Sequence, residues 1–315
     1  MNLFRTTSLL LALTLAAGVA SRAEAQGGTP TTLDRTRALG LDSLDAGYRV
    51  FHSDGYAERA AEMGRLVAAS NAFYRDRLGV DVEVFTIALL DPADYERAAF
   101  PGGIPYGLPF VSDRVVVQPA DLRVGLVREA YAPYEATASP ELVARLGAVG
   151  LSYAEALPVL FDAIALHEIG HVQVDAYGLD TRQPWFDELM ATYLGYAFMR
   201  AHEPEMAVVW DVVLEAGRAG YEPVHTSLDD LNRLYTGVGF ENYVWYQNIF
   251  QDRVHALYDL SGLDFVRAAR ERLADPDWTP ETAAELVAAL DEVGPGFAQW
   301  AEAWEFAAPD AGRAE

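Results

Sequence analysis

His167-Glu168-Ile169-Gly170-His171 is the stretch from which both the fold and the chemistry of this chain follow. Four residues of α-helix turn through about 400°, so both imidazoles project from one face and can reach one ion. Glu168 lies on the flank of that face, where a water activated by the ion needs a proton acceptor. The stretch therefore indicates a hydrolytic zinc site on a helix, with the geometry found in peptidases.

The residues around this motif predict a buried helix over residues 157–177. Rigid ligands need such a setting, because a packed helix holds its side chains still. The apolar neighbours that support it are Leu160, Phe161, Ile164, Ala165, Leu166, Ile169, Val172 and Val174.

A third ligand is required, because a catalytic zinc ion takes three protein ligands and keeps one position open. A histidine six residues after His171 would fall at position 177, which is tyrosine, and the next histidine is His202. We therefore expect a carboxylate. Glu188 could bring such an oxygen to the ion from a second helix, and Thr192 one turn later could hydrogen-bond around that carboxylate or its histidine partners. The alternative is that Glu188 belongs to a solvated first helical turn begun at Pro184, where negative charge favours the helix dipole.

The block Pro184-Trp185-Phe186-Asp187-Glu188-Leu189-Met190-Ala191-Thr192-Tyr193 resembles the second motif of the gluzincin metallopeptidases. It is most similar to the aminopeptidase group that includes leukotriene hydrolase, whose Trp-x-Asn-Glu-x-x-Ala-Ser/Thr-Tyr segment supplies the glutamate ligand. The gap between the two motifs is a residue or two shorter than usual. The resemblance covers roughly residues 150–270 and implies a thermolysin-like, two-lobe α+β fold with the active site between the lobes.

The resemblance also implies roles for individual residues. His167, His171 and Glu188 would hold one zinc ion per chain, and Glu168 would be the general base. A tyrosine on a later helix would stabilise the oxyanion. Tyr246 fits that role because it precedes the glycine turn at Gly262 by sixteen residues.

Two rivals to Tyr246 and one departure from the family pattern remain open. Tyr243 lies one turn earlier on the same helix face, and His225 would serve in a thermolysin-like arrangement. The segment Gly102–Gly107 has no acidic residue where the aminopeptidases carry the glutamate that binds a free amino group. Endopeptidase activity is therefore as consistent with the sequence as amino-terminal trimming.

The first 25 residues have the features of a signal peptide. Arg5 precedes an apolar run over Leu9–Val19, and Ala23-Glu24-Ala25 provides a small-x-small cleavage site. We expect export to a periplasm or the cell exterior, with no membrane anchor after cleavage. The chain has 315 residues and no cysteine, which excludes disulfides and thiolate ligands.

The remaining chain divides into three parts. Residues 26–40 are predicted to be a flexible leader. Residues 41–150 are predicted to be an α/β lobe, with strands at 48–52, 82–90 and 114–118, a helix at 56–78, and an ambiguous stretch from residue 120. Residues 151–315 are predicted to be a helical lobe that carries the zinc motif.

The function predicted on these grounds is zinc-dependent hydrolysis of a peptide or protein substrate. A formal net charge of −24 makes nucleic acid and anionic membrane surfaces poor partners. One alternative is an inactive or non-proteolytic binding protein on the zincin fold, and another is a purely structural zinc ion. The substrate and the oligomeric state are left open.

Overall fold

The computed structural model describes residues 30–82, 86–136, 138–179, 181–218, 221–274 and 280–305. The predicted signal peptide, residues 1–25, lies outside this part of the chain. Over the described residues the predicted α+β class is confirmed, with 13 α-helices and one five-stranded mixed sheet.

The sheet has the strand order β1-β2-β3-β5-β4. The inner strands β2, β3 and β5 are parallel to one another, and β1 and β4 pair antiparallel at the two edges. Every residue of β3 and β5 is buried, as expected for central parallel strands covered on both faces. The strands are β1 (Asp42–Asp45), β2 (Arg49–His52), β3 (Thr86–Leu90), β4 (Phe110–Ser112) and β5 (Val115–Pro119).

Five helices accompany the sheet in the first half of the chain. The predicted helix at 56–78 is confirmed as α2, which ends at Gly79 in the left-handed conformation (φ 70°) that favours glycine. The ambiguous stretch after residue 120 contains two short helices. These helices are α1 (Thr32–Ala38), α2 (Ala57–Leu78), α3 (Pro92–Ala98), α4 (Leu126–Tyr131) and α5 (Pro140–Ala148).

Helix α1 corrects the prediction of a flexible leader for residues 30–40, the part of the predicted leader that the structure describes. Thr31 and Asp34 form a capping box that starts the helix. The backbone N–H of Thr32 donates to Asp113 (2.9 Å) and its hydroxyl donates to Ser112 (3.0 Å), so α1 is fixed to the hairpin of β4 and β5. A cap and tertiary hydrogen bonds such as these therefore order residues whose composition is typical of a linker.

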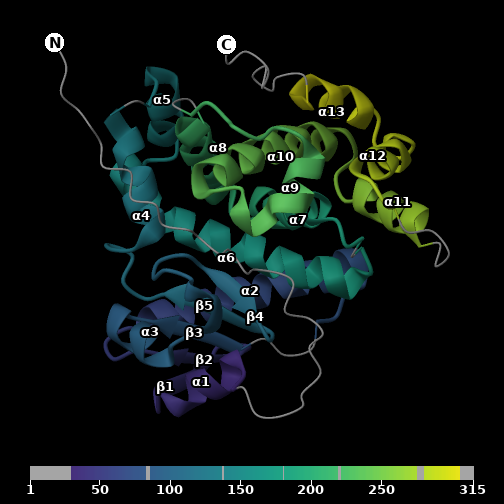
Figure 1. Cartoon of the computed structure of the whole chain (residues 1–315). Coiled ribbons are helices and arrows are strands. Elements are labelled where there is room, and N and C mark those ends of the chain that lie inside the picture. The colour runs from purple at the N-terminus through teal and green to yellow at the C-terminus, as the bar shows by residue number, and fades with distance from the viewer. Residues whose placement is uncertain are drawn as a thin grey trace.

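The described residues of the second half of the chain are mainly helical, as predicted. Helix α6 crosses the molecule with the sheet on one side and α7, α8 and α10 on the other (Figure 1). Among the described residues after α6 there is no strand. The helices are α6 (Tyr153–Tyr177), α7 (Pro184–His202), α8 (Pro204–Arg218), α9 (Leu228–Leu234), α10 (Phe240–Ser261), α11 (Asp264–Leu273), α12 (Ala283–Asp291) and α13 (Phe297–Glu305), with 3₁₀ turns η1 (Pro101–Gly103), η2 (Ala132–Ala136) and η3 (Tyr235–Gly237).

Local signals set both ends of α6. Ser152 and Glu155 form a capping box at its start, and Gly178 ends it in the left-handed conformation (φ 76°). Within the described ranges no single helix is long and apolar enough to cross a membrane, and only α5 and α6 together, bent by 71°, reach that length and composition. Most of α6 is buried inside the protein.

Candidate metal centre

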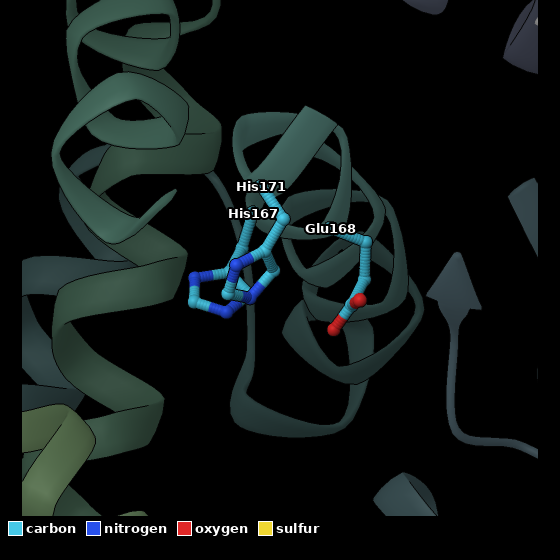
Figure 2. Close-up of side chains that lie close together, drawn as sticks. All are labelled: His167, Glu168 and His171. Carbon is cyan, nitrogen blue, oxygen red and sulfur yellow. The ribbon is translucent and has the colours of Figure 1, made fainter. Parts of the chain in front are cut away.

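Two imidazoles and a carboxylate meet where α6 packs on α7. The Nε2 atom of His167 lies 3.2 Å from Oε2 of Glu188, and the Nε2 atom of His171 lies 3.7 Å from Oε1 of the same residue. Ligand atoms of His167, Glu168 and His171 also lie within 4.8 Å of one another. Figure 2 shows the two imidazoles side by side on α6, with Glu168 projecting on their flank.

The close approach of α6 and α7 depends on two glycines. A Cβ atom at Gly170 would lie 2.5 Å from the carbonyl oxygen of Ala191, closer than any side chain tolerates. A Cβ at Gly195 would lie 3.2 Å from the backbone nitrogen of His167. The missing side chains let the two helix backbones touch, and this brings Glu188 to the histidines.

The solvated-turn interpretation of Glu188 is wrong, because its side chain is only 1% exposed. Three donors from the following segments bind its carboxylate instead. The hydroxyl of Tyr235 donates to Oε1. The hydroxyl of Tyr243 and the Nε2 amide of Gln247 both donate to Oε2, and these two bonds are 2.7 Å long.

The donor set fits a zinc ion. Ligand atoms about 2.1 Å from a tetrahedral zinc ion lie about 3.4 Å from one another, and the two nitrogen–oxygen separations of 3.2 and 3.7 Å bracket that value. Moreover, the Nε2 atom of His171 is buried and has no hydrogen-bond partner among the described residues. An ion would satisfy it.

The electrostatics of the site suit both a ligand set and a base. Burial lowers the pKa of His171 to about 4, so its lone pair is available at neutral pH. Burial works to raise the pKa of Glu188, but the adjacent His171 and His167 together hold it well below the usual range. Burial, with the charge of Glu188, raises the pKa of Glu168 to about 7, against the opposing effects of His167 and the backbone of Val111.

The structure does not bring Tyr246 to the cluster. Its hydroxyl donates to the backbone carbonyl of Ser227 (2.7 Å) and not to Glu188. His225 also lies elsewhere, with Nδ1 3.4 Å from Asp230. Among the three candidates weighed for the oxyanion, only Tyr243 contacts the ligand set, because the face of α10 that meets α7 carries residue 243 rather than 246.

Two further residues of the site, Gln247 and Tyr235, were not predicted from the sequence. Gln247 had a signal, because it follows Tyr243 and precedes Gln251 at a spacing of four on one helix. Polar residues repeated at that spacing on a buried face need partners. Tyr235 stands in η3, where no periodicity indicates its direction.

Zinc is expected to stabilise the protein against heat. At a zinc concentration about 100 times Kd the added stability is about 2.7 kcal/mol, which raises the melting temperature by roughly 5–10 °C in a chain of this size. Calorimetry with and without zinc measures this shift. Without zinc, the His171→Phe protein should melt at the same temperature as the wild type, because His171 Nε2 has no hydrogen-bond partner among the described residues. The rise in melting temperature on adding zinc should vanish in this variant. A rise of equal size in both proteins would place the ion elsewhere.

Comparison with known proteins adds no assignment. No protein-family model, no curated protein and no solved structure matches this chain.

Proposed function

We propose that this protein is an exported, zinc-dependent peptidase of the gluzincin type. The observation that carries the proposal is the meeting of His167, His171 and Glu188 at ligand spacing beside the buried carboxyl group of Glu168. Export rests on the sequence of residues 1–25 alone.

Each residue of the cluster has a role in this proposal. His167, His171 and Glu188 would hold the ion. A bound zinc ion supplies a Lewis acid that polarises the scissile carbonyl and makes a water more acidic. Glu168 would accept the proton of the attacking water and later pass it to the leaving amine.

Two phenols are placed to stabilise developing negative charge. Tyr235 and Tyr243 both donate to the carboxylate of Glu188, so both hydroxyls lie at the edge of the ligand set. Either could turn to donate to the oxyanion of the tetrahedral intermediate. Tyr243, like Tyr246, lies on a helix after the zinc motif, as the family resemblance implies for the tyrosine that stabilises the oxyanion. It replaces Tyr246 in the proposal.

The substrate would lie between the sheet and the helices beyond α6, as in a two-lobe zincin. Strand β4 supports this placement, because it is an edge strand and the backbone of Val111 within it contacts Glu168. An edge strand has one row of backbone groups that an extended peptide can pair with. The family resemblance also makes this the expected substrate path.

The buried position of Glu168 argues against a binding protein that has lost catalysis. Its side chain is 6% exposed, and burial disfavours its charged form. A carboxyl group that is costly to bury on an apolar helix is retained where a reaction needs it. A structural ion would in turn favour four protein ligands.

The test is mass-spectrometric mapping of cleavage in a mixed peptide library by purified residues 26–315. The proposal predicts cuts that disappear when the protein is stripped by a chelator and return when one equivalent of zinc is restored. The positions of the cuts distinguish internal cleavage from trimming at an end. Cuts that survive chelation, or no cuts from protein that carries one zinc per chain, would contradict the proposal.

A further inference from the structure

We infer that Gln247 is a positioning residue that couples two metal ligands from a third helix. This inference rests on the zinc site of the proposed function. The side-chain amide of Gln247 binds Glu188 directly and reaches His167 through Thr192. We call this chain of hydrogen bonds, from Gln247 through Thr192 to His167, the relay. It decides which nitrogen of His167 is free to bind zinc.

The donors and acceptors along the relay can be assigned in only one way. A carboxylate only accepts hydrogen bonds, so the atom of Gln247 that lies 2.7 Å from Glu188 Oε2 is the amide nitrogen. The amide oxygen therefore faces Thr192 Oγ1 (3.1 Å) and accepts its single proton. The Thr192 oxygen must then accept from Nδ1 of His167, which lies 3.1 Å away.

The consequence for His167 is a fixed tautomer. A neutral imidazole carries one proton, and the relay places it on Nδ1. Nε2 is then the nitrogen left to bind an ion, and it faces Glu188 Oε2 at 3.2 Å, a separation that a proton bridges in the metal-free protein and that an ion would bridge in its place. The hydrogen bonds outside the ligand set thus prepare His167 to bind an ion through Nε2.

The relay belongs to a polar row along α10. Tyr243, Gln247 and Gln251 follow one another at a spacing of four and so share a face of that helix. The Oε1 atom of Gln251 accepts from Nε1 of Trp210 (2.8 Å), and the indole of Trp210 stacks over His167 with ring centroids 6.0 Å apart. Helix α10 therefore fixes His167 by a hydrogen-bond route and by a packing route.

Burial makes this relay energetically significant. The side chains of Thr192 and Gln247 are 1% and 5% exposed, so removing either one leaves its partner without a hydrogen bond inside the protein. Hydrogen-bond partners of metal ligands typically contribute 10–100-fold to metal affinity. We expect an effect of that size here.

The experiment is a double-mutant cycle on zinc affinity, measured by competition with a chromophoric chelator. Thr192→Val and Gln247→Met should each weaken zinc binding by about 10–100-fold. The zinc affinity of the double variant should be about equal to that of the single variant with the lower affinity, because both changes break the same relay. Thr192→Ser keeps the hydroxyl and should bind within about threefold of the wild type.

A second readout separates positioning from general damage. In cobalt-substituted protein the visible absorption of the ion should shift in Thr192→Val and Gln247→Met but not in Thr192→Ser. Thr181→Val is the matched control, because its hydroxyl is buried without a hydrogen-bond partner among the described residues and its loss should change neither affinity nor spectrum.

The outcomes distinguish this inference from the proposed function. Single variants that bind zinc as the wild type does, or a double variant whose loss is the product of the two single losses, would overturn the relay while leaving the zinc site intact. A wild-type protein that binds no zinc would overturn both.

Discussion

Replacing Glu168 by glutamine is expected to lower kcat/KM for peptide hydrolysis by about 10²–10⁴-fold, the usual contribution of a general base. Glutamine has nearly the same shape, but its amide cannot take a proton from water. The proposed ligands are His167, His171 and Glu188, so bound zinc should stay at the wild-type level. Peptide kinetics and metal analysis on the same sample measure both quantities.

The matched control is Asp175→Asn, which makes the same chemical change on the same helix. Asp175 is exposed near the end of α6, and its replacement should alter neither activity nor metal content. A Glu168→Gln protein with wild-type kcat/KM would show that the carboxyl group has no part in the reaction. A variant that loses zinc as well would instead assign Glu168 to the ligand set.

Gly170→Ala is expected to have the largest effect on stability of any single-methyl change at the site. The added Cβ would lie 2.5 Å from the carbonyl oxygen of Ala191, so α6 and α7 must separate. Overpacking of this kind costs about 1–3 kcal/mol in free energy of unfolding. Zinc affinity should fall too, because the separation moves Glu188 away from His167. Denaturant unfolding of the metal-free protein and zinc competition measure the two effects.

Gly147→Ala controls for helix propensity. Gly147 is exposed in α5, and a Cβ there would meet no atom within 4 Å. Alanine at that position should stabilise the protein by up to about 1 kcal/mol. If Gly170→Ala were equally stable and bound zinc as tightly as the wild type, the helix contact would not be what sets the ligand spacing.

The long elements of this fold could be predicted from the sequence because their signals are local. The apolar run around His167 and the proline at position 184 indicate α6 and α7. The resemblance of residues 184–193 to the second gluzincin motif implies that Glu188 meets the histidines. The described structure confirms these elements and brings the three side chains together. That they hold zinc remains a prediction.

Short elements escaped prediction because tertiary contacts stabilise them. β1, β4 and α9 have four, three and seven residues, too few to show a period. Helix α1 looked like a linker because the hydrogen bonds that fix it come from distant residues, among them Ser112 and Asp113 about 80 residues away.

The direction of a side chain around a helix was the least predictable feature. Tyr243 and Tyr246 both lie on α10, and their spacing from the zinc motif does not show which of them faces α7. Only the packing of α10 on α7 decides this, and it selects Tyr243 and Gln247. Tyr235 reaches Glu188 from a 3₁₀ turn whose path the sequence does not determine.

The most direct test of the central claim is X-ray absorption at the zinc edge of the protein reconstituted with one equivalent of zinc. We predict that the protein supplies three ligands, two imidazole nitrogens and one carboxylate oxygen, and that the His171→Phe protein, treated in the same way, holds no zinc in this ligand set. Four protein ligands, or a spectrum unchanged in that variant, would contradict an open catalytic zinc site at His167, His171 and Glu188.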